Sequence, residues 1–137
     1  MKTKINLAPQ GCMVIICGIT NLEDANEIAE FGVDYLGFII DYPKSPRSLN
    51  LDEVTLITTQ IKKDFPSIKL VGVFVDKNLD FVRKAIDSCH LDVAQLHGSE
   101  SVEYCKDLKN SAEVFKAIII KNRQDVLEAE KYRGVAD

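Results

Sequence analysis

Short apolar runs alternate with longer amphipathic segments along almost the whole chain, and this alternation limits the fold more than any other feature of the sequence. The apolar runs span residues 13–17, 35–40, 69–75, 92–96 and 114–120. Their lengths suit strands buried on both faces. Because a helical segment follows each run, the chain crosses back before each new strand, which makes neighbouring strands parallel. The sequence therefore predicts an α/β fold with a parallel sheet.

The amphipathic segments begin at residues that commonly cap helices. The predicted helix starts are Thr20, with the spacing of a capping box to Glu23, then Asn50, Asn78, either Ser99 or Ser101, and Asn122. Residues 133–137 resemble the lead-in to a sixth strand. The pattern alone does not separate an open doubly wound sheet from part of a closed barrel, although no G-x-G-x-x-G follows the first run, which disfavours a dinucleotide-binding fold.

Length and charge narrow the classes of protein that fit. The 137 residues make one domain, shorter than a complete (β/α)₈ barrel of about 200 or more residues. A net charge of −4 gives no reason to expect nucleic acid or an anionic membrane as a partner. No apolar run approaches the roughly 18 residues of a membrane span, and the first twelve residues are too polar for a signal peptide.

Cysteine and histidine positions predict neither a disulfide framework nor a metal site. No C-x-x-C pair occurs, and the two histidines, His90 and His97, have no metal-ligand spacing with the cysteines. A chain this rich in apolar residues does not need disulfides, so we expect a reducing, cytoplasmic setting.

Polar residues at the predicted C-terminal ends of the strands are the candidates for chemistry, because active sites of parallel α/β folds lie there. These candidates are Cys17, Arg47, Asp76, Gln95 and His97. Each has a simpler structural explanation. A cysteine that ends an apolar strand is usually a small core residue, an arginine in a Ser-Pro-Arg loop is usually solvated, an aspartate such as Asp76 turns the chain, and such a histidine is often only hydrogen-bonded structure.

Several motifs, in order along the chain, resemble those of the phosphoribosylanthranilate isomerase family. They are residues 16–21 (I-C-G-I-T-N), 37–39 with 45–47 (G-F-I and S-P-R), 71–75 (V-G-V-F-V), 95–100 (Q-L-H-G-S-E) and 116–117 (K-A). The resemblance runs from residue 13 to the last residue. It implies a (β/α)₈ TIM barrel of which residues 13–137 form the first five βα units, preceded by an extension over residues 1–12.

The resemblance also implies an activity: isomerisation in tryptophan biosynthesis, by an Amadori rearrangement of an N-glycosyl amine, a phosphosugar-anthranilate, to an amino-ketose. No metal or organic cofactor is implied. A general acid opens the ribose ring and a general base removes the C2′ proton. Cys17 is implied as the base. A cysteine acts as a base only through its thiolate, so we expect its pKa to be lowered by nearby positive charge or helix N-termini. Arg47 is implied at the anthranilate carboxylate, with Gln95 and His97 as positioning groups, and no role is carried over to Asp76.

The chain also departs from the family pattern. The family's general acid follows strand six and its phosphate loops follow strands seven and eight, all beyond Asp137, so we predict no isomerase activity for this chain alone. Ile15 stands where many relatives have lysine, on the same side as Cys17 by strand alternation. The open edges and an inner face that includes Ile15, Cys17, Phe38 and Val73 predict a homodimer or a complementing C-terminal chain.

Three interpretations stay open. The chain is a truncated isomerase or one half of a split enzyme, or it is a non-catalytic remnant or binding module that keeps Arg47, Gln95 and His97 as an anion site. The third interpretation, another phosphosugar barrel enzyme, is the weakest, because the combination of I-C-G-I-T with Q-L-H-G points to the isomerase family.

Overall fold

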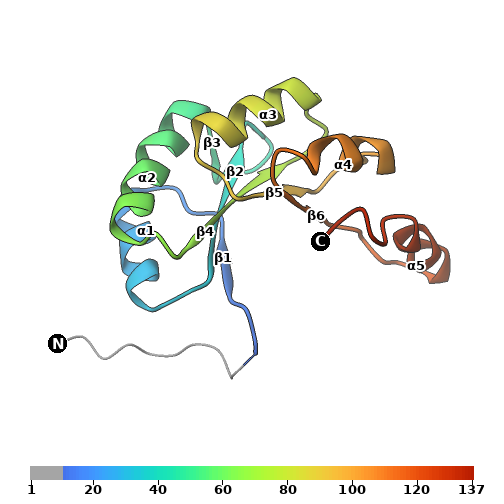
Figure 1. Cartoon of the computed structure of the whole chain (residues 1–137), viewed down its shortest axis with the longest axis horizontal. Coiled ribbons are helices and arrows are strands. Elements are labelled where there is room, and N and C mark those ends of the chain that lie inside the picture. Colours follow the sequence, from blue (N-terminus) through green and yellow to red (C-terminus); the bar gives the residue numbers. More distant parts are fainter. Residues whose placement is uncertain (1–10) are drawn as a thin grey trace.

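The computed structural model describes residues 11–137, which form one parallel sheet with helices packed along it (Figure 1). Most of the predicted extension, residues 1–12, lies outside the described residues. The elements are β1 (Ile15–Cys17), α1 (Leu22–Glu30), β2 (Tyr35–Ile40), β3 (Ser48–Leu49), α2 (Leu51–Asp64), β4 (Lys69–Phe74), α3 (Leu79–Ser88), β5 (Val93–Leu96), α4 (Val102–Leu108), β6 (Glu113–Lys116) and α5 (Arg123–Glu130).

All strand pairs in the sheet are parallel, which confirms the predicted class. The strands follow the order β1-β2-β4-β5-β6, and the two-residue β3 pairs with the end of β2. The sheet is not closed: within residues 11–137, β1 and β6 each have a single strand neighbour. Figure 1 shows α1 to α4 arranged around one side of the curved sheet, with α5 beyond β6.

The two faces of the sheet differ in what covers them. Alternate residues of β2, among them Leu36 and Phe38, are fully buried against the helices. The other face carries a small cluster of Tyr35, Val71 and Val93 with Phe115 packed against it. The prediction that Phe38 lies on that inner face is wrong, because Gly37 pairs with Cys17 and neighbouring strand residues point to opposite faces.

The two end strands, β1 and β6, are shorter and their apolar runs are more exposed than the sequence predicts. The first run was expected to be a strand buried on both faces, but β1 begins only at Ile15, and Ile15 and Ile16 are 41% and 36% exposed. β6 stops at Lys116, and Ile119 and Ile120 beyond it are exposed. Apolar content predicts burial only where a neighbouring element is present, and each of these strands has one strand neighbour.

Helix starts agree with the sequence apart from one. α1 begins after Asn21, whose side chain accepts from the backbone N–H of Asp24, so Thr20 is not the cap. Asn50 caps α2 as predicted and forms a full capping box with Glu53, and Asn78, Ser101 and Asn122 cap the later helices. Thr20 and Asn21 both suit a cap, and the sequence pattern favoured the neighbouring residue.

At three places an aspartate forms two hydrogen bonds, through its own N–H and its carboxylate, with one residue near the start of the preceding strand. We call this arrangement the aspartate clasp. Asp34 donates its N–H to the carbonyl of Val14 and accepts the Val14 N–H on its carboxylate at 2.7 Å. Asp92 does the same with Leu70, also at 2.7 Å. Asp34 and Asp92 directly precede β2 and β5. The clasp therefore fixes each strand beside the preceding one at the N-terminal end of the sheet.

The third clasp joins Asp137 to β6. Asp137 donates its N–H to the carbonyl of Val114 at 2.8 Å, and its carboxylate accepts the Val114 N–H at 3.1 Å. Residues 133–137, predicted as the lead-in to a further strand, thus end in the arrangement that elsewhere precedes a strand.

None of the helices formed by residues 11–137 has both the length and the apolar character needed to cross a membrane.

Candidate active site

The sequence candidates come together at the C-terminal ends of the strands. Cys17 is the last residue of β1, Gln95 lies in β5, and His97 follows β5 directly. All three line one cavity of about 350 Å³ on the inner face, whose other lining residues are Ile15, Ile39, Val73 and Phe115. Ile15 therefore shares a face with Cys17, as strand alternation predicts. The cavity is thus lined by one thiol, one amide and one imidazole, and its remaining walls are apolar.

Two glycines make room for the candidate side chains. A Cβ atom on Gly37 would lie 2.8 Å from the Cys17 Sγ, closer than side chains approach each other, so the thiol occupies the space that a larger residue would fill. Gly18 has a φ of +84°, a conformation that other residues rarely adopt, and a Cβ there would lie 3.0 Å from the Arg47 Cδ. The glycines thus permit the positions of both Cys17 and Arg47.

Arg47 reaches the site from the loop between β2 and β3. Its N–H donates to the Ser45 hydroxyl at 3.2 Å, and the exposed side chain lies over the backbone of Gly18, next to the thiol. The short strand β3 holds the end of this loop, since Ser48 and Leu49 pair with Ile39 and Ile40. The sequence predicts only a proline-containing loop here, because a strand of two residues has no periodicity that could reveal it.

The Cys17 pKa does not follow the expectation. Partial burial of the thiol raises its pKa, and this effect exceeds the lowering by the Gly18 backbone hydrogen bond and by the Arg47 charge. The prediction of a lowered pKa is therefore wrong for this chain. The cation is present, but the apolar walls of the cavity remove more water from the thiolate than one exposed guanidinium compensates.

His97 sits in a segment whose backbone is held tightly. Its N–H donates to the Phe74 carbonyl at 2.8 Å, while the residue as a whole is exposed. Asp76 forms the turn after β4 with a φ of +50°, and its carboxylate accepts from the Ser99 N–H at 2.6 Å and the Ser99 hydroxyl at 2.8 Å. Asp76 thus turns the chain, as its structural explanation predicts, and joins the loops after β4 and β5.

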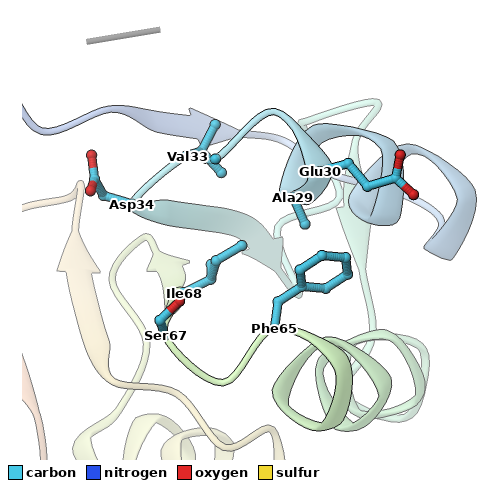
Figure 2. Close-up of a pocket in the computed structure, with 8 residues that line it drawn as sticks. Ala29, Glu30, Val33, Asp34, Phe65, Ser67 and Ile68 are labelled. Atoms are coloured by element: carbon cyan, nitrogen blue, oxygen red, sulfur yellow. The ribbon is translucent and has the colours of Figure 1, made fainter. Parts of the chain in front are cut away.

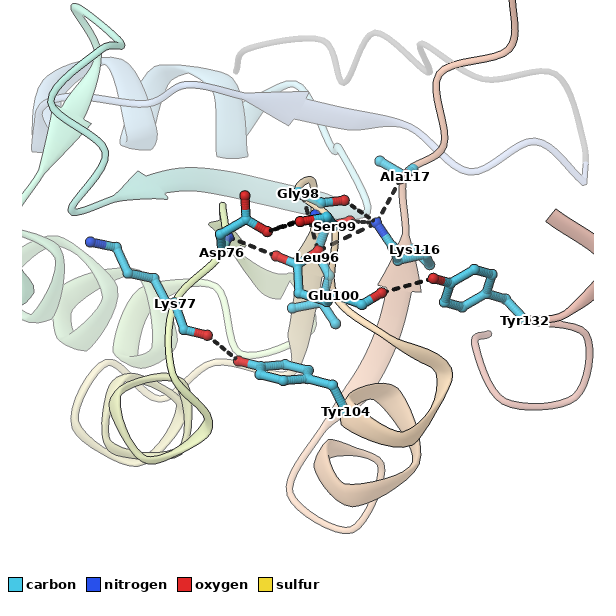
Figure 3. Close-up of polar contacts among 10 residues, drawn as sticks. All are labelled: Asp76, Lys77, Leu96, Gly98, Ser99, Glu100, Tyr104, Lys116, Ala117 and Tyr132. Carbon is cyan, nitrogen blue, oxygen red and sulfur yellow. Dashed lines mark hydrogen bonds and ion pairs between the residues drawn. The ribbon is translucent and has the colours of Figure 1, made fainter. Parts of the chain in front are cut away.

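A buried ion pair beside His97 was missed as a functional feature. Lys116 Nζ lies 3.3 Å from a carboxylate oxygen of Glu100, and the two side chains are only 4% and 2% exposed. Figure 3 shows the ammonium group surrounded by carbonyl oxygens and the carboxylate turned toward the Asp76 and Gly98 backbone. Both residues belong to recognised motifs, but a charged residue at the end of a short strand or in the loop after one is normally solvated, so their burial has no signal in the sequence.

A larger cavity, of about 670 Å³, lies at the other end of the sheet (Figure 2). It is formed by the C-terminal end of α1 and the segments that lead into β2 and β4, with Val33, Phe65 and Ile68 on its walls. None of the candidate residues reaches it. Parallel α/β folds place their chemistry at the C-terminal ends of strands, so we assign the site to the smaller cavity. Across residues 11–137, no three His, Cys, Asp or Glu side chains are grouped as a metal site requires.

The sequence of this chain is similar to the sequences of one known protein family. The profile described as N-(5'-phosphoribosyl)anthranilate (PRA) isomerase matches residues 14–137. The N-(5'-phosphoribosyl)anthranilate isomerase of Geotalea uraniireducens is 42% identical over 120 residues, which cover 88% of this chain and 56% of the relative. The chain therefore spans a little over half the length of this curated relative.

Solved structures give the same result. Monomers generated from the dimeric phosphoribosylanthranilate isomerase of Thermotoga maritima superpose with a TM-score of 0.81 at 36% identity, covering 89% of this chain and 61% of that one. A phosphoribosylanthranilate isomerase bound to reduced 1-(o-carboxyphenylamino)-1-deoxyribulose 5-phosphate superposes with a TM-score of 0.83, also at 36% identity and with the same two coverages.

Proposed function

Because this chain belongs to the N-(5'-phosphoribosyl)anthranilate isomerase family, whose members are isomerases of tryptophan biosynthesis, we propose that it supplies the N-terminal part of such an enzyme. The reaction is the Amadori rearrangement of N-(5-phosphoribosyl)anthranilate to the 1-deoxyribulose phosphate product. The observation that carries the proposal is the meeting of Cys17, Gln95 and His97 in one cavity, with Arg47 beside the thiol, at the C-terminal ends of parallel strands.

Cys17 is the general base in this proposal. Its thiolate takes the C2′ proton once the ribose ring has opened to an imine, and the enolamine that forms then tautomerises to the ketose. The exposed Cys17 lines the cavity, where a sugar carbon can approach its thiol, and Gly37 leaves the space that the thiol needs. Arg47 supplies the nearest positive charge, which favours the thiolate.

Arg47, Gln95 and His97 bind and orient the substrate. A guanidinium pairs with a carboxylate through two parallel hydrogen bonds, so Arg47 suits the anthranilate carboxylate. Gln95 and His97 project from one side of β5 into the same cavity. They offer an amide and an imidazole to the open-chain sugar, while Ile39, Val73 and Phe115 supply apolar surface for the aromatic ring.

The open sheet forms the first five βα units of an eight-unit TIM barrel in this proposal, within a domain over residues 13–137. Three observations favour a covering partner: β1 and β6 each have one strand neighbour within residues 11–137, Ile15 is 41% exposed, and Ile119 and Ile120 are exposed. We propose that a second copy or a chain with the remaining units covers these surfaces. The cysteines are unpaired, which suits a cytoplasmic location.

We expect no turnover from residues 1–137 alone. The general acid and the phosphate loops implied by the family follow the sixth to eighth strands of the family's barrel, beyond Asp137. The burial that raises the Cys17 pKa also disfavours the thiolate. A partner that brings further charge and hydrogen bonds to the cavity would supply both the missing groups and a lower pKa.

The test is complementation. The chain is mixed with the separately expressed C-terminal part of the Geotalea uraniireducens relative, and loss of phosphoribosylanthranilate fluorescence is followed. We expect turnover in the mixture, none in either part, and loss of turnover with Cys17→Ala. Cys12→Ala is the matched control, because it removes an exposed thiol outside the cavity.

Three results would contradict the proposal. Turnover by the chain alone, abolished by Cys17→Ala, would exclude the predicted inactivity. Undiminished turnover by the Cys17→Ala mixture would exclude Cys17 as the base. A stable complex of the two parts with no turnover would exclude the isomerase function.

A binding module without turnover is the second candidate, and the exposed Arg47 side chain over Gly18, beside the cavity, is the observation that favours it. In that case the cavity binds an aromatic carboxylate through Arg47. Calorimetry with anthranilate separates the two candidates: binding that is weakened by Arg47→Gln, together with an inactive mixture, identifies the module.

A further inference from the structure

We infer that Lys116 and Glu100 are positioning residues that fix His97 in the candidate site. Lys116 donates to the Leu96 carbonyl at 3.2 Å and to the Gly98 carbonyl at 2.8 Å, the residues on either side of His97. Its third hydrogen bond goes to its own neighbour, the Ala117 carbonyl, at 2.9 Å. One buried ammonium group at the end of β6 thus holds the carbonyls of both residues that flank His97.

Glu100 holds the same segment from the other side. One carboxylate oxygen accepts the Gly98 N–H at 3.0 Å, and the other accepts the Asp76 N–H at 2.9 Å (Figure 3). The Tyr132 hydroxyl donates to the Glu100 carbonyl at 2.8 Å, so the residues just after α5 join the network. Together with the bond from the His97 N–H to Phe74, hydrogen bonds hold the N–H groups of His97 and Gly98 and the carbonyls of Leu96 and Gly98.

The space around this network is also tight. A Cβ on Gly98 would lie within 2.8 Å of the Asp76 backbone N and closer still to its carboxylate, so the loops after β4 and β5 are in direct contact. The one large group of residues 96–98 that stays exposed is the His97 side chain, which lines the cavity. The network therefore holds the backbone and leaves the imidazole available to a ligand.

Stability alone does not explain the pair. Removing two charges from water costs several kcal/mol per ion, and well-packed apolar residues of similar volume are often as stable or more so. An ammonium with three donors and a carboxylate with two acceptor oxygens can instead hold five backbone groups of three segments in one geometry. The inference rests on the proposed function, because that function makes His97 a substrate-binding residue. Its test, however, does not require turnover.

The test uses histidine NMR on the full chain. The chain has two histidines, and His90 precedes β5 at the other end of the sheet, so it reports on general structural change. The variant is Lys116→Met with Glu100→Gln, which removes both buried charges and leaves neither one unpaired. We expect the imidazole resonances of His97 to shift and broaden, those of His90 to stay in place, and the far-ultraviolet circular dichroism to remain that of the parent chain.

The matched control is Lys106→Met with Glu103→Gln, an exposed pair of the same residue types joined at 2.8 Å on α4, which should shift neither histidine. Unchanged His97 resonances in a folded Lys116/Glu100 variant would overturn the inference. So would equal shifts of both histidines, or a variant that fails to fold, because the pair would then hold the whole sheet and not one segment. An inactive complementation mixture would remove the isomerase proposal and leave this NMR result standing.

Discussion

The carboxylate of Asp137 accepts the backbone N–H of Val114 at 3.1 Å while the Asp137 N–H donates to the Val114 carbonyl at 2.8 Å. The same two bonds join Asp34 to Val14 and Asp92 to Leu70. A backbone N–H at the first residues of a strand has no helix or turn to satisfy it, so the clasp removes an unpaired donor as well as setting strand order.

The clasps formed by Asp92 and Asp34 should contribute differently to the free energy of unfolding. The Asp92 carboxylate accepts the N–H of Leu70, a fully buried residue, and also binds Lys62 at 2.6 Å. The Asp34 carboxylate accepts the N–H of Val14, which is only partly buried. We expect Asp92→Ala to lower the free energy of unfolding by about 1–3 kcal/mol and Asp34→Ala by less. Urea unfolding at neutral pH measures both, with the exposed Asp107→Ala as control. Equal losses for Asp34 and Asp92 would contradict the prediction.

Asp76 should make stability depend on pH at the acidic end. Hydrogen bonds from the Ser99 N–H and hydroxyl lower its pKa. A lowered pKa contributes stability that is fully present above the ordinary carboxyl pKa of about 3.9 and is lost as the pH falls through the folded value. Asp76→Asn keeps the φ of +50°, which asparagine tolerates. The parent chain should therefore be more stable than this variant at pH 7, with the difference shrinking below about pH 4.

Urea unfolding at a series of pH values measures this difference. Asp107→Asn is the control, because it changes an exposed carboxylate on the surface of α4. A gap between parent and Asp76→Asn that persists unchanged at low pH would show that the Ser99 contacts do not depend on the carboxylate charge.

Gly37 and Cys17 should be coupled. Alanine at position 37 places a Cβ 2.8 Å from the Cys17 Sγ and 3.1 Å from its Cβ, so Gly37→Ala should cost about 1–3 kcal/mol through overpacking. In a Cys17→Ala background the sulfur is gone and the cost should fall. A double-mutant cycle by chemical unfolding measures the coupling. Additive effects would mean that the thiol moves aside freely.

Cys17 should react as a weakly acidic thiol. Because partial burial raises its pKa, iodoacetamide labelling should reach half its maximum rate above the ordinary cysteine value of about 8.5. Arg47→Gln should raise that midpoint further, since the Arg47 charge lowers the pKa. Mass spectrometry in a Cys12→Ser background follows Cys17, because Cys89 and Cys105 are buried. A midpoint below the ordinary value, or one unmoved by Arg47→Gln, would contradict this account.

Much of this molecule follows from its sequence. Apolar runs and cap residues give the parallel sheet and the helix order, because both depend on local periodicity. Strand ends give five candidate residues, and the family resemblance selects Cys17, Arg47, Gln95 and His97 among them. The structure brings these four to one end of the sheet. These features are local or follow directly from parallel topology.

The features that the sequence did not predict depend on distant neighbours. Exposure of Ile15 and Ile16 follows from their place at an end of the sheet, and the raised Cys17 pKa follows from how the cavity walls displace water. The buried Lys116–Glu100 pair needs the meeting of β6 with the loop after β5. Phe38 was assigned to the wrong face because strand register fixes the face, and register is set by pairing.

The aspartate clasp has a consequence for how such a chain is made. Each clasp is complete as soon as two successive units exist, and none of the three needs contact with a unit that comes later. A ribosome releases the units in this same order, so β2 can pair with β1, and β5 with β4, as soon as each has been synthesised. Synthesis and assembly can therefore advance together, without waiting for a ring to close.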